Sequence, residues 1–400
     1  MQKQNISQLE FVAMMASLMS VVALAIDALL PALDIIGISI ATKTDADNQL
    51  LITMIFLGLG FGPLIFGPIS DSLGRKPMVF VGFGVFFIAS IICVLADSLE
   101  MMIFGRILQG IGLSAPRTIS IAIIRDIYSG DRMAKIMSFV VVVFLLVPII
   151  APAMGKYILD HFNWQAIFYT QIGFCFVIAF WFWKRQPETL KEENRIKFTK
   201  NLFKDGFKEL MKYPATIGYT IISGFVTGSF MVYLSSSQQV FQDQYLMKDE
   251  FPYIFAGLAI AMGAAIFLNG IYVMKFGMKK IIHYSMVGYM LVSLLYIFLY
   301  SQTTNPPIEV LLLFFALQFF AIGFLFGNLR SLAMQPVGHI AGIASAITGL
   351  ISTLMAVPIS IFIGRYVSDT VLPLFIGFFV CSAFSVAILF YLYKKNKATL

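Results

Sequence analysis

The chain has 400 residues, of which 59% are hydrophobic and only 12% charged, and its formal net charge is +7. Soluble domains carry about 25% charged residues, so this chain cannot cover a water-facing surface and is expected to lie in a membrane. Twelve apolar stretches have spanning length, and their long runs favour helices over the short alternating strands of a barrel: 11–33, 49–70, 78–96, 100–124, 136–159, 165–183, 215–237, 251–274, 281–300, 308–329, 340–364 and 371–393.

The positive charge reports orientation in the membrane. If the N-terminus lies in the cytoplasm, the inner segments hold 22 of the 28 Lys and Arg residues and the outer segments hold 4. This distribution fits the positive-inside rule. We therefore expect a multi-pass protein with both termini in the cytoplasm and no nucleic-acid partner.

The first predicted helix contains two acids, in ALAIDALLPAL and the Asp34 that follows. Asp27 and Asp34 are seven residues apart, about 700° on a regular helix, so they would share a face about 10 Å apart. Pro31 between them is expected to kink the helix. Burial disfavours a charged carboxylate and a nearby arginine favours it, so both are candidates for proton coupling, and Asp27 is also a candidate for the substrate cavity. Alternatively, Asp34 is a solvated carboxylate at the outer helix end.

The stretch GPISDSLGRKP follows the second predicted helix. Arg75 is expected to hold this loop in the cytoplasm, whereas Gly67 and Gly74 permit close packing and a tight turn. Positive-inside topology does not require a carboxylate, so Asp71 points to a further role.

The fourth predicted helix carries two arginines, and an arginine in the bilayer costs about 2.5–3.5 kcal/mol and is functional by default. Arg106 and Arg117 are eleven residues apart and lie within roughly 20° of one face. Arg106 is a candidate for proton coupling, and Gln109 and Arg117 for the substrate cavity. Alternatively, Arg106 extends to the outer surface and Arg117 forms a structural ion pair.

The fifth predicted helix reads VVVFLLVPIIAPAMGKYI. Its candidate motif consists of Pro148, Pro152 and Gly155. A generic kinked helix would also explain this pattern.

A polar segment, 184–213, divides six predicted spans from six. We expect an N-terminal six-helix bundle at 1–183, a cytoplasmic linker at 184–214 and a C-terminal six-helix bundle at 215–400. Apolar residues between 201 and 213 recur with helical spacing, which predicts either an amphipathic helix on the inner leaflet or a solvated tether.

The two halves are related by a repeat. GIYVMKFGMKK lies 203 positions after the first glycine motif, and its Gly270 and Gly277 match Gly67 and Gly74. Such repeats are typical of transporters. No acid lies within the body of a span in the second half. The second half is therefore expected to supply apolar and neutral polar surface to the substrate cavity, with the candidates Tyr233, Asn269, Gln318 and Asn328.

No pattern typical of a cofactor or enzyme site is present in the sequence. The three histidines lie in different loops, away from any metal-ligand spacing, and neither a nucleophile triad nor a Walker motif occurs. We expect no metal, no cofactor other than the proton as coupling ion, and no enzymatic activity.

The pattern Gly-x-x-x-Asp-x-x-Gly-Arg-Lys resembles the cytoplasmic signature of the major facilitator superfamily. In that family the Asp caps the N-terminus of helix 11, and the loop Arg pairs with an acid at the inner end of helix 4, the position of Asp126 in IIRDIY. The resemblance implies the major facilitator fold and an inner latch that holds the outward-facing state. The latch residues would be Gly67, Asp71, Gly74, Arg75 and Asp126.

Two further stretches resemble antiporter motifs. Arg106-Ile-Leu-Gln109-Gly110 resembles Arg-x-x-Gln-Gly, whose Arg is tied to proton coupling, and the fifth helix resembles Gly-Pro-x-x-Gly-Gly, from which Ala151 and Lys156 depart. With NWQAIFY, the ordered series over 20–190 is similar to the bicyclomycin/chloramphenicol-resistance (Bcr/CflA) branch of the drug:proton antiporters.

This resemblance implies a proton-coupled secondary transporter that exports small lipophilic compounds or drugs by alternating access. Its expected place is the bacterial inner membrane, and its expected state is a monomer in the lipid bilayer. One alternative keeps the fold and takes up a small polar solute with protons. Another is a polytopic membrane enzyme or sensor, which would need a catalytic cluster or a soluble output domain.

Overall fold

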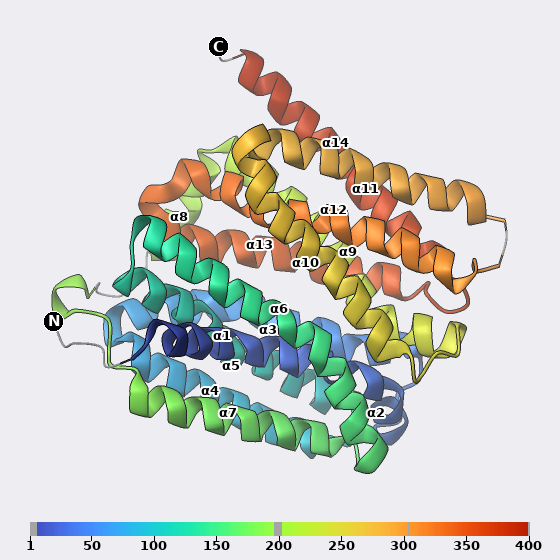
Figure 1. Ribbon diagram of the computed structural model, residues 1–400, viewed down its shortest axis with the longest axis horizontal. Helices are drawn as coiled ribbons and strands as arrows, with labels where there is room; N and C mark the ends of the chain where they lie inside the picture. Colours follow the sequence, from blue (N-terminus) through green and yellow to red (C-terminus); the bar gives the residue numbers. More distant parts are fainter. Residues whose placement is uncertain (1–5, 196–201, 303, 399–400) are drawn as a thin grey trace. The chain divides into compact units, whose positions relative to one another are not determined.

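The computed structural model describes residues 6–195, 202–302 and 304–398, and every regular element within these residues is a helix (Figure 1). Twelve helical stretches in this described part are long and apolar enough to cross a membrane. The predicted all-α membrane fold with twelve spans is therefore confirmed. By its internal contacts the chain forms two units, residues 1–43 with 54–200, and residues 44–53 with 201–400.

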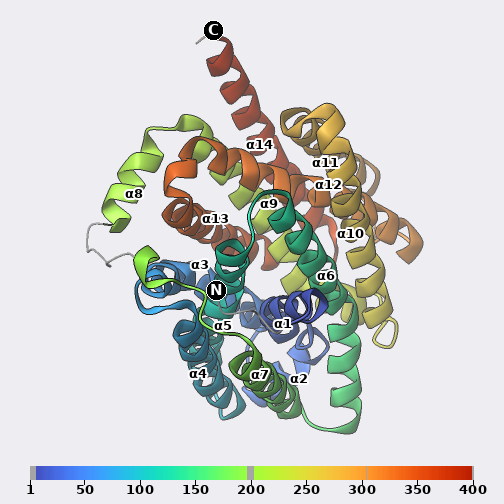
Figure 2. The same ribbon diagram turned by 60° about the vertical axis from the view of Figure 1, so that its left-hand side comes forward.

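Unit 1 contains the first six spans. Its elements are α1 (Gln8–Asp27), η1 (Leu30–Ala32), α2 (Leu33–Ser39), most of α3 (Asp45–Leu73), α4 (Arg75–Val94), α5 (Leu99–Ile127), α6 (Gly130–His161), α7 (Gln165–Arg185) and the short η2 (Glu192–Asn194). Helix α5 packs against α4 and α1, and α1 also packs against α6 and α7 (Figures 1 and 2). This arrangement places the end of α1, where Asp27 lies, beside Arg106 of the fourth span.

The first span is broken where the sequence places Pro31. Helix α1 ends at Asp27, a 3₁₀ turn follows at Leu30–Ala32, and α2 begins at Leu33. Proline fixes φ and donates no backbone hydrogen bond, so a regular helix cannot continue through it unchanged. The predicted kink is confirmed. The regular helix assumed in placing Asp27 and Asp34 on one face is wrong, because the two acids belong to different helical segments.

Unit 2 contains the second six spans. Its elements are α8 (Leu202–Met211), α9 (Pro214–Gln238), the π-helical η3 (Gln239–Gln244), α10 (Phe251–Phe276), α11 (Met278–Tyr300), α12 (Ile308–Met334), η4 (Gln335–Ile340), α13 (Ala341–Gly364) and α14 (Leu372–Ala398). Helix α9 packs along α13, and α12 packs against α10, α11 and α9.

The polar linker contains the helix expected from its spacing, α8. Leu210 on this helix is fully buried, and a Cβ on Gly206 would meet the Ile343 side chain of α13 at 2.9 Å. Phe207 and Met211 remain exposed. One part of the apolar face therefore packs on α13 of the same unit, and another part stays uncovered.

Residues 44–53, which include the first turns of α3, group with unit 2 by their contacts. The Gln49 amide donates to Gln239 Oε1 over 2.9 Å and to the Gly364 carbonyl over 3.3 Å. Gln239 in turn donates to Asp45 Oδ2 over 3.1 Å. The N-terminal end of α3 is thus tied to α13 and η3 by polar contacts, although the rest of α3 belongs to unit 1.

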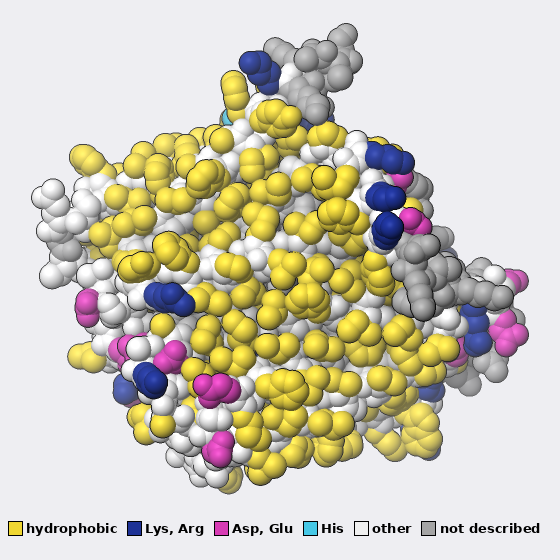
Figure 3. Space-filling view, turned by 180° about the vertical axis from the view of Figure 1, so that it is seen from behind, with side chains coloured by type: hydrophobic (Ala, Val, Ile, Leu, Met, Phe, Trp, Pro, Cys, Tyr) yellow, Lys and Arg dark blue, Asp and Glu magenta, His cyan; other side chains and the backbone are white. Residues whose placement is uncertain are grey.

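The surface matches the membrane expectation. On the face in Figure 3, hydrophobic side chains cover the helices along most of their length, and charged side chains gather near helix ends. Large side chains such as Phe298, Tyr253 and Phe267 are more than two-thirds exposed. In water such exposure would be costly, whereas lipid accepts it.

Candidate functional site

Arg106 lies fully buried in α5, with 0% of its surface exposed. Its Nη1 and Nη2 each donate to the Ala25 carbonyl of α1 over 3.1 Å, and Nη1 also donates to Gln109 Oε1 over 2.7 Å. The guanidinium therefore points into unit 1. The alternative prediction, in which the Arg106 side chain extends to the outer surface, is wrong.

The Ala25 carbonyl is free to accept because α1 ends nearby. In a continuous helix its partner would be the N–H of Leu29. In this structure the Leu29 N–H bonds the Ile26 carbonyl instead, over 3.3 Å. A carbonyl at a helix end needs another donor, and Arg106 supplies two. The break at Pro31 thus creates the docking point for the arginine.

Asp27 is the last residue of α1 and is only 5% exposed. Among the described residues, no side chain or backbone group forms a hydrogen bond or ion pair with its carboxylate. Arg106 instead binds the carbonyl of Ala25, two residues before Asp27 on α1. The Arg106 guanidinium therefore binds α1 close to Asp27, but it forms no ion pair with the Asp27 carboxylate.

Gly155 of α6 packs directly against this end of α1. A Cβ at Gly155 would overlap the Ala28 carbonyl oxygen. Only glycine allows the two backbones to approach so closely. Pro152 is buried one turn earlier in the same helix, and Pro148 is half-buried. The structure thus brings the helix 5 motif to the residue that follows Asp27.

Gln109 is fully buried between α5 and α4. Its oxygen accepts from Arg106, and its Nε2 donates to Ser90 Oγ of α4 over 2.8 Å. Both ends of this amide are used on protein partners. A direct role in the substrate cavity, as expected from the sequence, remains a prediction.

Two other predicted residues lie farther along their helices. Asp34 is half-buried in the first turn of α2, beyond the break. Arg117 is half-buried in α5, just after Pro116. Asp34 therefore remains a candidate for proton coupling, and Arg117 remains a candidate for the substrate cavity.

A second charged cluster surrounds Arg75 at the start of α4. Its Nε donates to Asp126 Oδ2 over 3.0 Å, and its Nη1 binds both the Asp71 carboxylate and Ser70 Oγ, the latter over 2.9 Å. Arg75 is 4% exposed. Three of the predicted latch residues thus meet. Helix α13, the partner implied for Asp71, belongs to unit 2, so that contact remains a prediction.

The polar segment after α7 completes this cluster. Glu188 accepts from the backbone N–H groups of Arg75 and Lys76 over 3.0 and 2.9 Å, and so caps α4. Thr189 Oγ1 donates to Asp126 Oδ2 over 3.1 Å. Sequence reasoning missed both residues, because the first polar residues after a span carry no signal of a return contact.

The two glycines of this loop differ. Gly74 has φ of +115°, a conformation that glycine adopts readily and other residues do not. A Cβ there would also meet Glu188 Oε2 at 2.7 Å. By contrast, a Cβ on Gly67 would meet no described atom within 4 Å. The close packing expected at Gly67 is therefore absent, and the tight turn at Gly74 is present.

The four candidates of the second half take part in contacts between helices. Asn328 of α12 donates to Asn269 Oδ1 of α10 over 2.6 Å, and Gln318 of α12 donates to Ser293 Oγ of α11 over 2.6 Å. The Tyr233 ring lies 4.4 Å from that of Phe319, centroid to centroid. These contacts fit the interhelical role of membrane amides.

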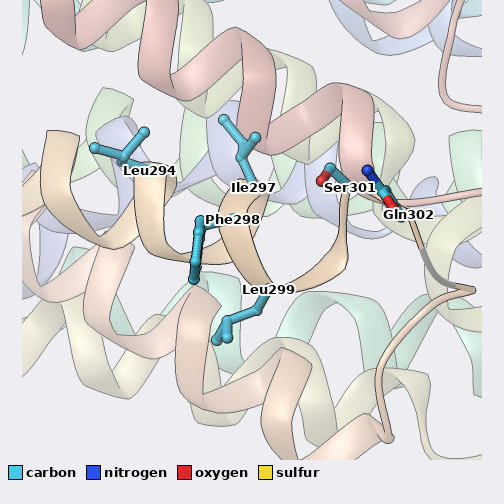
Figure 4. Close-up of a pocket in the computed structure, with 6 residues that line it drawn as sticks. All are labelled: Leu294, Ile297, Phe298, Leu299, Ser301 and Gln302. Atoms are coloured by element: carbon cyan, nitrogen blue, oxygen red, sulfur yellow. The ribbon is translucent and has the colours of Figure 1, made fainter.

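A hollow of about 570 Å³ lies at the C-terminal end of α11 (Figure 4). It is lined by Leu294, Ile297, Phe298, Leu299, Ser301 and Gln302. None of these residues is charged, and none belongs to the predicted sites. No group of three or more His, Cys, Asp or Glu that could hold a metal was found among the described residues.

Comparison with known proteins bears on the family. The sequence model of the Major Facilitator Superfamily matches residues 11–357. A bicyclomycin resistance protein homolog of Haemophilus influenzae is 28% identical over 352 residues, 87% of each chain. The multidrug resistance protein MdtL of Citrobacter koseri is 31% identical over 156 residues, which are 38% of this chain and 40% of that protein.

A D-xylose-proton symporter of known structure shares the fold. Its TM-score is 0.71 at 14% identity, over 96% of this chain and 97% of the symporter. The twelve spans, the cluster at the start of α4 and the family match over most of the chain agree. The chain therefore belongs to the Major Facilitator Superfamily and is a multi-pass membrane transporter.

Proposed function

We propose that this transporter exports small lipophilic compounds in exchange for protons, by alternating access. The names of its sequence relatives support export, since they refer to bicyclomycin resistance and multidrug resistance. The likeness to the D-xylose-proton symporter carries the fold alone and gives no support to uptake.

The observation that carries the proposal is the Asp27 carboxylate. It is buried at the end of α1 and has no ion pair or hydrogen bond among the described residues. An ionised carboxylate in such surroundings is costly. A group of this kind binds a proton when it is sealed off and loses it when water reaches it. Asp27 would therefore carry the proton, with Asp34 as the reserve candidate nearer the next helix.

Arg106 would respond to the charge on Asp27. Because it is held on the Ala25 carbonyl, two residues before Asp27 on α1, it supplies a positive field close to the carboxylate. Release of the proton from Asp27 leaves a negative charge that this field stabilises. Binding of a compound in the same unit would change the balance between the protonated and the ionised form of Asp27. Gln109 and Arg117 would then contribute to the cavity from α5.

The cluster at Arg75 would act as the inner latch. Arg75 ties the end of α3 to the end of α5 through Asp71 and Asp126. A partly buried ion network of this kind has alternative partners when its helices move. In the outward-facing state we expect Asp71 also to meet the N-terminus of α13, where the helix dipole favours a carboxylate.

The proposed location is the bacterial inner membrane, with both termini in the cytoplasm. The distribution of 22 basic residues on one side against 4 on the other supports this orientation.

An export assay in cells tests the proposal. The protein would be expressed in a bacterial host that lacks its own efflux pumps, and growth would be measured on a panel of lipophilic compounds that includes bicyclomycin. We expect resistance to at least one compound, lower cellular accumulation of it, and loss of both with Asp27→Asn. Raised accumulation with the protein present would contradict export and favour uptake.

A further inference from the structure

The two units contain the same buried amide–hydroxyl pair. In unit 1, Gln109 of α5 donates to Ser90 Oγ of α4 over 2.8 Å, and the Ser90 hydroxyl donates to the Phe86 carbonyl over 2.8 Å. In unit 2, Gln318 of α12 donates to Ser293 Oγ of α11 over 2.6 Å. The Ser293 hydroxyl donates to the Tyr289 carbonyl over 2.9 Å.

The two serines keep the offset of the repeat, and the two glutamines lie on the helices that follow them. Ser90 and Ser293 are 203 positions apart, the same offset as Gly74 and Gly277. Both serines and both glutamines are fully buried. In each unit the pair therefore joins equivalent helices, α4 with α5 and α11 with α12.

The other end of the amide differs between the units. Gln109 Oε1 accepts from Arg106, three residues earlier on α5. The residue three positions before Gln318 is Phe315, and Gln318 Oε1 has no hydrogen-bond partner among the described residues. Only the pair in unit 1 is connected to a charged group.

Ser90 fixes the orientation of the Gln109 amide. Because the Ser90 hydroxyl already donates to the Phe86 carbonyl, its oxygen is left to accept from Gln109 Nε2. The amide oxygen must then face Arg106. If the hydroxyl were absent, the amide could rotate, and its NH₂ group would repel the guanidinium.

We propose that Ser90 is a positioning residue for proton coupling, which acts through Gln109 to hold Arg106 on the Ala25 carbonyl and away from the Asp27 carboxylate. This inference rests on the proposed function. Without Ser90, Arg106 has a weaker hold on Ala25 and can pair with Asp27 on the same helix end. A paired carboxylate keeps its charge to lower pH.

Other titratable groups surround this site. On the helices packed against α1 and α5 they include Cys93 on α4, Lys156 on α6 and Cys175 on α7, and both cysteines are buried. Lys156 is already paired with Asp160 over 3.0 Å. These groups are the same in all the variants below, so a change between variants reports on Arg106 and Asp27.

The test is an infrared titration of the purified full-length protein in lipid. The stretching band of a protonated carboxyl group is followed against pH, and the part that Asp27→Asn removes belongs to Asp27. With Ser90→Ala we expect the midpoint of this band to move to lower pH by about one unit. Gln109→Met, which removes the amide by another route, should give the same shift.

Ser293→Ala is the matched control, because it removes the equivalent hydroxyl from unit 2. It should leave the midpoint in place, and Ser90→Thr, which keeps the hydroxyl, should do the same. Equal shifts for Ser90→Ala and Ser293→Ala, or no shift for Ser90→Ala and Gln109→Met, would overturn the inference and leave the proposed function standing. A titrating Asp27 band combined with normal uphill transport by Asp27→Asn would instead overturn the assignment of the proton to Asp27 and make Asp34 the first candidate. A wild-type protein without such a band would contradict both.

Discussion

The two copies of the glycine loop keep the same backbone turn but differ in charge. Gly74 and Gly277 both have positive φ, +115° and +79°. In the first copy the turn is surrounded by Asp71, Arg75 and the incoming Glu188. In the second, the positions 203 residues after Asp71 and Arg75 are Met274, which is 88% exposed, and Met278.

The glycine turn, present in both copies, serves the fold, whereas we assign the ion-paired charges, present in one copy, to the function. A turn between two antiparallel spans is required in both units, so both retain the glycine. The second copy keeps basic residues but lacks the ion-paired Asp71 and Arg75, which are found only in unit 1 together with Asp27 and Arg106. The amide–hydroxyl pairs differ between the units in the same way, because a guanidinium donates a hydrogen bond to Gln109 in unit 1 and the matching position before Gln318 in unit 2 is Phe315. This contrast supports the proposal that unit 1 carries the charge-dependent steps of transport.

The largest effect is expected when the first copy is made like the second. Arg75→Met should lower the free energy of unfolding by about 3 kcal/mol, because it leaves Asp71 and Asp126 without their partly buried cation. The reverse change, Met278→Arg, lies in a more exposed loop and should stay within about 0.5 kcal/mol. Denaturant unfolding in detergent measures both. Equal effects would show that the two loops are equivalent.

A second comparison uses the glycines themselves. Gly74→Ala and Gly277→Ala should each cost about 1–3 kcal/mol of stability, since both force alanine into a conformation that it rarely adopts. Gly74→Ala should cost more, because its Cβ would also press on Glu188, whereas nothing lies within 4 Å at Gly277. Thermal unfolding of the two variants side by side decides the order. A larger loss at Gly277 would contradict this account of the loop.

The cap on α4 should have a smaller effect. Glu188→Ala removes the acceptor for the N–H groups of Arg75 and Lys76, and loss of a helix cap costs about 1 kcal/mol. Glu193→Ala is the control, because Glu193 lies in the same segment and is exposed in its pair with Lys191. Its removal should leave the unfolding midpoint unchanged. If both variants behave alike, Glu188 does not stabilise α4.

The smallest effect is expected for an ion pair outside both clusters. Asp160→Asn removes the partner of Lys156 at the end of α6, where the carboxylate is about half exposed. Exposed pairs contribute about 0–1 kcal/mol, so stability and transport should both be close to wild type. A strong loss of transport would mean that charges beyond the two clusters take part in coupling.

The sequence was sufficient for the coarse architecture because apolar runs and proline act locally. The twelve spans, the break at Pro31 and the helix in the linker could all be predicted in this way. The pairing of Arg75 with Asp126 was expected from family resemblance, and the structure contains it. The regular helix through Asp27 and Asp34 was wrong, because the 3₁₀ turn changes the rotation between them.

Contacts across long stretches of chain could not be read from the sequence. Glu188 caps a helix that begins 113 residues earlier, and nothing near either residue indicates the other. Ser90 looks like any small polar residue in a span, and its role appears only when α4 and α5 are packed together. The amides of the second half were equally compatible with a cavity and with helix contacts, and their hydrogen bonds are to other helices.

The claim that unit 1 carries the proton is tested most directly by transport in proteoliposomes with an imposed pH gradient. Movement of a compound identified in the resistance screen is followed together with proton flux, for the wild type, Asp27→Asn and Glu309→Gln, an exposed acid of unit 2. The account predicts that Asp27→Asn loses both gradient-driven accumulation and compound-dependent proton flux, while Glu309→Gln retains both. Retention of proton-driven accumulation by Asp27→Asn would contradict it.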